Sequence, residues 1–293
     1  MGFHIRGFHD GDLPRLVELL NGVYRNSYEF VPFTEEKLRL EIVERKLRVL
    51  VAEEKGVVFS CVAYGRSPWG MEIEWLAASE ETIRDALVEE VEKNVEDEVF
   101  TTVDFGSPMM NFWVRHGYKA EGGLYQMVAR LDGVKPLPEV PAGTVIRSLK
   151  PGEEKLLIET VNSAYGWERM RDGSVARWKT EHPPFNEEWI HVAEIGEKIV
   201  SAVVSRPDTE YNEFFKAKRG YLGPAATLPD YRGKNLASAL TRRAMNFFYE
   251  KGMDSVALYT VEQNTPSVML LRKLGFEVGH HWRFMRKTLM KKG

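Results

Sequence analysis

The feature that most constrains how this 293-residue chain can fold is an internal repeat. Three short patterns occur twice in the same order, the first two at an offset of 141 residues and the third at an offset of 158. They are Asn21-x-x-Tyr24 with Asn162-x-x-Tyr165, Val51-Ala52-Glu53 with Val192-Ala193-Glu194, and Trp113–Tyr118 with Leu271–Phe276. Since each copy then closes with a strand-like segment, the order predicts one domain duplicated in tandem.

A segment rich in proline and glycine separates the two copies. Residues 132–143 contain three prolines and two glycines, which interrupt helices and strand ladders alike. We therefore expect a first domain at 1–131, a linker at 132–143 and a second domain at 144–293, a division that fits the chain length. In both halves the expected order is strand, one or two helices, three strands, helix, strand, helix, strand. This order predicts an α/β (α+β) fold in which helices cover the sheets.

Composition excludes several classes of protein. The chain has 40 Lys and Arg against 43 Asp and Glu, a net charge of −3, so no electrostatic argument favours a nucleic-acid or membrane partner. No apolar run approaches the roughly 20 residues of a membrane-spanning helix, and the first residues do not form a signal peptide. The single cysteine, Cys61, leaves no intrachain disulfide, and no third ligand accompanies His280 and His281, so we expect no metal site. These features predict a soluble, cytoplasmic protein.

The second copy holds 17 additional residues between its Val-Ala-Glu and its Gly275-Phe276, and this stretch contains a distinctive strand–turn–helix segment. A strand near 219–228 leads into Arg232-Gly233-Lys234, and the amphipathic helix expected at 233–251 follows. No carboxylate lies between Arg232 and Glu250. Because a helix N-terminus offers unpaired N–H groups and partial positive charge, this segment suits a phosphate. The alternative is an ordinary basic helix start.

The first copy differs at the matching place. There Ser79 is expected to be the N-cap, and Glu80 and Glu81 would complement the helix dipole and repel a pyrophosphate. We therefore predict that only the second half binds a phosphorylated cofactor.

Two segments of the second half together resemble the GNAT (Gcn5-related N-acetyltransferase) superfamily. Pro229–Ala237 is similar to its acetyl-CoA loop, with Asn235 in place of the middle glycine, and Asn264–Phe276 is similar to its later Asn…Gly-Phe segment. Asparagine tolerates positive φ better than other non-glycine residues, so the turn can persist. The resemblance implies two tandem GNAT-like domains, each a mixed, mostly antiparallel sheet flanked by helices, with a degenerate first copy that lacks the cofactor loop.

The resemblance also implies a reaction, the movement of an acetyl group from acetyl-CoA to a primary amine by direct attack in a ternary complex. The catalysis implied is mainly proximity, orientation and proton removal from the amine. The residues implied to bind acetyl-CoA are Ala226, Thr227, Leu228, Arg232, Gly233, Lys234, Asn235, Leu236, Ala237 and Asn264.

The proton-transfer residues depart from the family pattern. The fourth-strand position often held by a glutamate base is Tyr221, the fifth-strand position is Tyr259, and the position of the usual tyrosine acid is Leu271. Tyr221 and Tyr259 are the candidate catalytic residues, although both could be hydroxyls that only satisfy strand ends. Glu194 is a further candidate, but its counterpart Glu53 favours a shared structural role. The alternative function is a non-catalytic protein that holds CoA or acyl-CoA as a sensor or scaffold. Acceptors left open are a small-molecule amine and a peptide N-terminus, and the chain could be a monomer or a homodimer.

Overall fold

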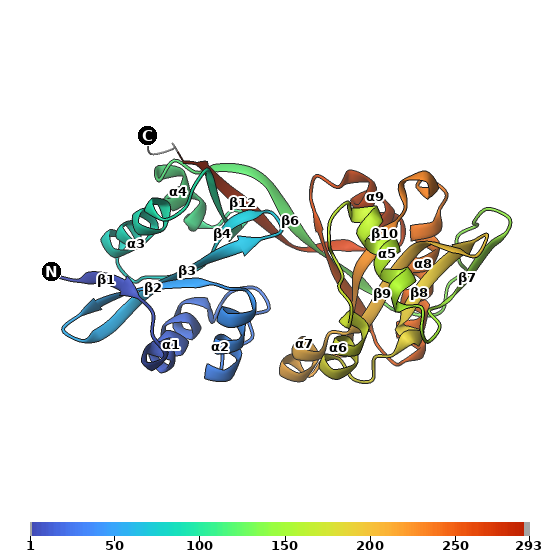
Figure 1. Cartoon of the computed structure of the whole chain (residues 1–293), viewed down its shortest axis with the longest axis horizontal. Coiled ribbons are helices and arrows are strands. Elements are labelled where there is room, and N and C mark those ends of the chain that lie inside the picture. Colours follow the sequence, from blue (N-terminus) through green and yellow to red (C-terminus); the bar gives the residue numbers. More distant parts are fainter. Residues whose placement is uncertain (1, 290–293) are drawn as a thin grey trace. The chain divides into compact units, whose positions relative to one another are not determined.

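The computed structural model describes residues 2–289, which divide into two compact units (Figure 1). The first unit comprises the described residues up to Leu124 together with those from His281 onward, and the second comprises Tyr125–His280. Elements of the first half of the chain are β1 (His4–Gly7), α1 (Leu13–Tyr24), α2 (Glu35–Glu44), β2 (Arg48–Glu54), β3 (Val57–Ser67), β4 (Gly70–Ala77), α3 (Glu81–Lys93), β5 (Glu98–Asp104), α4 (Pro108–Arg115) and β6 (Lys119–Arg130). Elements of the second half are β7 (Thr144–Ser148), α5 (Glu154–Tyr165), α6 (Ser174–Glu181), β8 (Ile190–Ile195), β9 (Lys198–Pro207), α7 (Thr209–Phe215), β10 (Arg219–Thr227), α8 (Leu236–Glu250), β11 (Ser255–Val261), α9 (Thr265–Lys273) and β12 (Glu277–Thr288).

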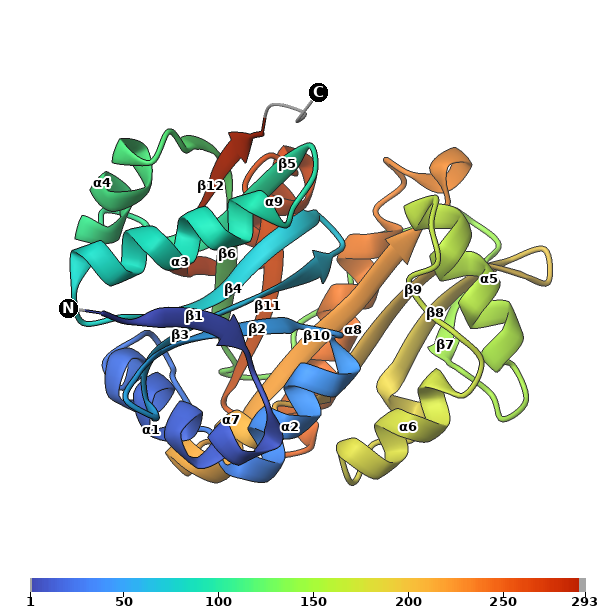
Figure 2. The same cartoon turned by 60° about the vertical axis from the view of Figure 1, so that its left-hand side comes forward.

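The first unit is a sheet covered by helices on both faces. Its strand order is β1-β2-β3-β4-β5-β12, and β4 and β5 run parallel. Because side chains alternate along a strand, Val49 and Val51 of β2 enter one core while Ala52 enters the other. The first core also holds Leu16 and Leu20 of α1, and Figure 2 shows α1 and α2 on one face of the sheet with α3 and α4 on the other.

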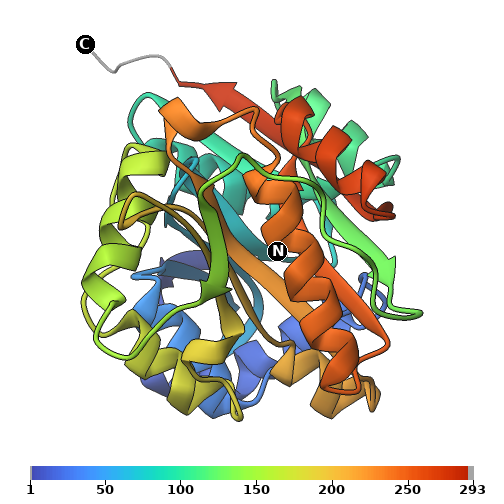
Figure 3. The same ribbon diagram turned by 90° about the vertical axis from the view of Figure 1, so that its right-hand side faces the viewer.

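The second unit repeats this plan. Its strand order is β6-β11-β10-β9-β8-β7, with β10 and β11 parallel, and Figure 3 shows α5 and α8 on either side of the sheet. The amphipathic pattern at 233–251 folds as α8, whose Leu240, Ala244 and Phe248 are fully buried. The mixed α/β fold class predicted from the sequence is confirmed.

The compact units exchange their last strands. Residues 282–288 of β12 pair antiparallel with β5 in the first unit, whereas β6 enters the second unit at Tyr125. The segment expected to be a linker, 132–143, lies within the second unit, where Asn246 of α8 bonds both backbone groups of Lys135 at 3.0 and 2.7 Å. That the two halves of the sequence are separate folding domains stays a prediction.

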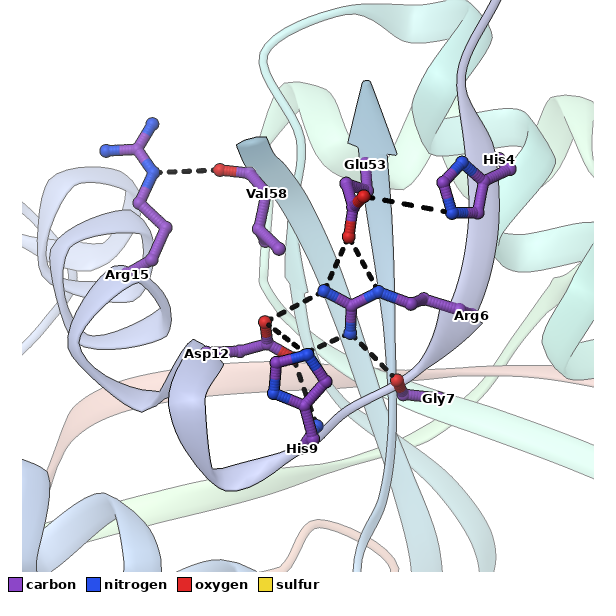
Figure 4. A network of polar contacts seen from close by, with 8 residues as sticks. All are labelled: His4, Arg6, Gly7, His9, Asp12, Arg15, Glu53 and Val58. Carbon is purple, nitrogen blue, oxygen red and sulfur yellow. Dashed lines mark hydrogen bonds and ion pairs between the residues drawn. The ribbon is translucent and has the colours of Figure 1, made fainter. Parts of the chain in front are cut away.

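The duplication extends to a polar network near the start of each half, and Figure 4 shows the copy in the first unit. In the first unit, Arg6 donates to Glu53 at 2.7 Å and to both carboxylate oxygens of Asp12 at 2.7 and 2.9 Å. In the second unit, Arg147 makes the same bonds to Glu194 at 2.8 Å and to Glu153 at 2.7 and 2.9 Å. All three positions are 141 residues apart, so in both units the arginine ties the edge strand to the neighbouring strand and to the N-cap of the first α-helix.

One local prediction is wrong. Ser79 is not the N-cap of α3, since the helix begins at Glu81 with Glu80 as N-cap and no side-chain capping bond, and Glu81 pairs with Arg115 instead. Between β9 and β10 the chain forms the short helix α7, whose left-handed C-cap residue Lys216 ends it before β10. Among residues 2–289, no helix has the length and apolar character needed to cross a membrane.

Candidate functional site

Strands β10 and β11 of the second unit part from one another partway along their length. Their parallel pairing covers three residue pairs and ends at Tyr221 with Ala257, although β11 continues to Val261. The antiparallel pairing of β10 with β9 shifts register between Leu222 and Ala225. The result is a gap between two neighbouring strands, open toward the end of β10.

Backbone N–H groups of β10 point into this gap. Leu228 donates its N–H to Val200 of β9 at 2.9 Å, and bonding alternates along an antiparallel ladder. The N–H groups of Ala225 and Thr227 therefore point away from β9, toward the gap. Of the strand residues predicted to bind cofactor, Thr227 has a backbone N–H without a partner among residues 2–289. The backbone N–H of Leu228 is bonded to β9, and the Ala226 carbonyl accepts from Ser201 Oγ at 2.9 Å.

The segment between β10 and α8 forms a turn lined by amide groups. Gly233 and Asn235 both adopt left-handed backbone conformations, with φ of 74° and 59°. Asn235 thus takes the conformation that a glycine would take, although its side chain makes no capping bond to α8. Within residues 2–289, no hydrogen bond occupies the backbone N–H groups of Gly233, Lys234, Leu236 and Ala237. Such a turn at a helix N-terminus is suited to an anion.

The two basic side chains of the turn, Arg232 and Lys234, differ in the contacts that they make within the chain. Arg232 donates to the carbonyls of Thr227 at 3.2 Å and Ala164 at 2.9 Å, so it ties the turn to the end of β10 and of α5. The Nζ of Lys234 lies 5.0 Å from the ring centroid of Tyr231. Both are exposed, and both add positive charge where the amides converge.

Asn264 caps the next helix, α9. Its Oδ1 accepts from the backbone N–H of Ser267 at 3.3 Å. Its Nδ2 has no acceptor in the described part of the chain and can donate to a ligand. The two segments singled out in the sequence, 229–237 and 264–276, therefore each contain a helix N-terminus, and these N-termini follow β10 and β11, the strands that part.

The candidate catalytic tyrosines lie on those same strands. Their rings are 6.0 Å apart, and burial raises the pKa of Tyr221 to about 12, so its phenol is neutral at pH 7. Tyr259 is 45% exposed, and its hydroxyl accepts from Gln126 at 3.4 Å. Leu271 is buried in the core, and Glu194 is held by Arg147. The sequence positions considered for a base or acid thus hold no free carboxylate.

Two residues that contact β10 at this gap, Arg206 and Tyr165, were not predicted as site residues from the sequence. The guanidinium of Arg206 lies 4.5 Å from the ring centroid of Tyr221, its partner in the β9–β10 register. The hydroxyl of Tyr165 donates to the carbonyl of Ala225 at 3.2 Å. The repeated Asn-x-x-Tyr pattern includes Tyr165, but its bond to Ala225 depends on where β10 lies in the folded chain. No sequence signal pairs Arg206 with Tyr221.

The first unit has the matching gap and closes it with a side chain. Strands β4 and β5 also share three parallel pairs. There the hydroxyl of Tyr24, 141 residues before Tyr165, accepts the backbone N–H of Leu76 at 3.0 Å, and burial raises the Tyr24 pKa to about 12. Only residues 78–80 connect β4 to α3, whereas 228–235 connect β10 to α8. The first unit thus lacks the amide-lined turn, and its strand N–H is already bonded.

Comparison with known proteins identifies relatives of this arrangement. Residues 155–276 match the family model described as the acetyltransferase (GNAT) family. The chain is similar to a mycothiol acetyltransferase of Saccharomonospora viridis, at 27% identity over 148 residues that cover 48% of each protein, so it spans about half the length of that relative.

Two solved structures match both halves. A GCN5-related N-acetyltransferase from Sphaerobacter thermophilus covers 99% of this chain and 97% of its own, with a TM-score of 0.73 and 18% identity. A tandem GNAT protein from the clavulanic acid biosynthesis pathway, without AcCoA, covers 100% of both chains with a TM-score of 0.69 and 15% identity. These likenesses confirm the tandem fold predicted from the sequence.

Proposed function

Since residues 155–276 match the model of the acetyltransferase (GNAT) family, we propose that the second unit moves an acetyl group from acetyl-CoA to a primary amine. The observation that carries the proposal is the gap between β10 and β11, which has free amides along β10 and in the turn before α8. Ala225 and Thr227 offer N–H groups along the strand, and the turn at 233–237 offers a further set at the helix. An extended thioester with a pyrophosphate at one end needs this combination of donors.

Each group of residues has a role in this proposal. The amides of 233–237 hold the pyrophosphate, with Arg232 and Lys234 adding charge. The free strand amides bond the pantetheine arm, and Asn264 Nδ2 donates to one of its amide carbonyls. The Ala225 N–H, next to the register shift, stabilises the negative charge that develops on the thioester oxygen as the amine attacks.

The proton of the incoming ammonium leaves to solvent rather than to a protein carboxylate. Tyr221 cannot accept it at neutral pH because its phenol holds its own proton up to about pH 12. Catalysis then rests on the orientation of a neutral amine against the thioester. The rate should rise with pH as the free amine increases, and it should persist in Tyr221→Phe.

A spectrophotometric assay of CoA thiol release with a panel of primary amines tests the proposal. We expect release with at least one amine, with a rate that rises through the pKa of that amine, and one acetyl-CoA bound per chain by calorimetry. Tight acetyl-CoA binding without release to any amine favours the second candidate, a sensor or scaffold. The observation that supports this second candidate is the buried Leu271, which occupies the position of the usual tyrosine acid. Absence of binding would exclude both.

A further inference from the structure

Arg206 lies where β10 and β11 begin to part. It is the register partner of Tyr221, and Tyr221 forms the last parallel pair with Ala257. The guanidinium stacks on the Tyr221 ring at 4.5 Å from its centroid, an arrangement that orients the cation through the aromatic face. Arg206 therefore stands at the vertex of the gap, where the proposed reaction takes place.

Within the described part of the chain, no carboxylate forms an ion pair with this cation. Among residues 2–289, its only hydrogen bond is a long one from Nη1 to the Gly223 carbonyl at 3.4 Å. Burial lowers the pKa of Arg206 and the charges of two carboxylates, Asp208 and Glu181, oppose this shift, but both carboxylates are already paired with other arginines. Asp208 pairs with Arg219 at 2.8 Å, and Glu181 pairs with Arg177 at 3.6 Å. Arg206 thus differs from Arg219, whose charge is paired with Asp208.

The environment makes an unpaired guanidinium costly. Arg206 is partly buried, and burial lowers its pKa, yet a guanidinium stays protonated in proteins. Its unpaired nitrogens are not sealed from solvent, unlike Nε of Arg243, which is buried without a partner. A second cation, Arg169, contributes to the same field and has no ion pair in the described chain. The vertex therefore carries positive charge that a ligand can reach.

We infer that Arg206 determines acceptor specificity by binding a carboxylate of the acceptor, so that the acceptor belongs to the amino-acid class. Guanidinium and carboxylate form two parallel hydrogen bonds, and Arg206 has donors free for them. Because Arg206 adjoins the reaction site, the carboxylate must lie close to the attacking amine, as in α- and β-amino acids. The inference rests on the proposed function and names the substrate class of the same site.

Paired acceptors test this inference directly. Each α-amino acid in a panel is assayed beside its carboxamide, which keeps the amine and the side chain but lacks the negative charge. We expect wild-type kcat/KM to favour the carboxylates, and Arg206→Gln to lower kcat/KM for them by about 10- to 100-fold, mainly through KM. The carboxamides should change less than threefold in Arg206→Gln, and Arg206→Lys should restore part of the loss. Arg177→Gln, which removes an arginine already paired with Glu181, should keep the wild-type selectivity.

The outcomes separate the inference from the proposed function. Equal losses for carboxylates and carboxamides in Arg206→Gln, or a wild-type preference for carboxamides, would overturn the inference while acetyl transfer stands. If no amine is acetylated, N-acetyl amino acids are titrated in the presence of CoA and the melting temperature is followed. A rise in wild type that disappears in Arg206→Gln supports carboxylate binding, and no rise in wild type rejects it.

Discussion

Arg147 donates through Nε to a carboxylate oxygen of Glu194 at 2.8 Å, just as Arg6 donates to Glu53 at 2.7 Å one repeat earlier. The bond occurs in both units, although only the second has the amide-lined turn. A carboxylate used in the same way by both copies is structural. The shared geometry therefore removes Glu194 from the candidates for a general base.

Glu194→Gln should consequently weaken the fold and spare the chemistry. The side chain is 23% exposed, so loss of its charge beside Arg147 should lower the free energy of unfolding by roughly 1–3 kcal/mol. Acetyl-transfer kcat should stay within about threefold of wild type, whereas a general base contributes 10²- to 10⁴-fold. Urea unfolding and the CoA-release assay measure the two effects. Glu53→Gln is the matched control in the other copy, and a 100-fold fall in kcat for Glu194→Gln alone would reinstate it as the base.

Gly233→Glu should abolish acetyl-CoA binding and leave the fold intact. A side chain at φ 74° strains the turn locally, but no atom lies within 4 Å of an added Cβ, so the new carboxylate has room and repels the pyrophosphate. Calorimetry should give an affinity lower by more than about 100-fold, given several charge-assisted bonds to the diphosphate. Gly252→Glu adds the same charge at φ 80°, also in open space, beyond the end of α8. Its affinity should match wild type, and equal losses in both variants would place the pyrophosphate elsewhere.

Tyr24→Phe should destabilise the first unit without creating a second cofactor site. Removal of its hydroxyl leaves the Leu76 N–H without its 3.0 Å partner in a buried place, a loss of about 1–3 kcal/mol in the free energy of unfolding. Tyr165→Phe, the counterpart, removes an exposed bond to the Ala225 carbonyl and should cost under about 1 kcal/mol.

Acetyl-CoA stoichiometry completes this comparison. The connection 78–80 is too short for the turn that 228–235 forms, so Tyr24→Phe should still bind one acetyl-CoA per chain. Two molecules bound by the variant would show that the tyrosine alone closes the first gap. Two bound by wild type would overturn the assignment of a single site.

The repeat predicted the elements because each copy carries its own periodicity and turn residues. The Asn-x-x-Tyr pattern also had a physical cause. Asn162 bonds the backbone of Met170 at 2.8 and 2.9 Å, and Asn21 bonds Phe33 at 2.8 and 3.0 Å, so each asparagine holds the loop after its helix. Local sequence encodes such contacts directly.

Contacts between strands were harder to predict. Periodicity shows which segments form strands, but the partner of an edge strand depends on the complete sheet, so the pairing of β12 with β5 was not foreseen. The same holds for Arg206, whose contact with the Tyr221 ring depends on the register of β9 against β10. Ser79 shows the opposite error, because a residue type that favours capping lies one position before the actual N-cap, Glu80.

A buried histidine should make the stability of the second unit depend on pH. His191 is 1% exposed, and its Nε2 lies 3.0 Å from Ser205 Oγ, which itself donates to the Trp189 carbonyl at 2.7 Å. Ser205 must therefore accept from Nε2–H, and Nδ1 is left buried without a partner. Burial, together with the charge of Arg243, lowers the pKa of His191 to about 3.

The sign of the effect follows from proton binding. Between pH 3 and the ordinary value of 6.5 the unfolded chain binds a proton that folded His191 does not, so the free energy of unfolding falls as the pH falls through this window. The slope is up to about 1.4 kcal/mol per pH unit. His191→Phe, whose ring would pack beside Phe247, should remove this contribution, so that urea unfolding at pH 7.5, 6.0 and 5.0 declines less steeply than in wild type. His182, with a pKa lowered by burial to about 4, should leave a residual slope. An unchanged slope in His191→Phe would mean that the imidazole at this position is protonated in the folded chain or that the unfolded chain does not bind the proton.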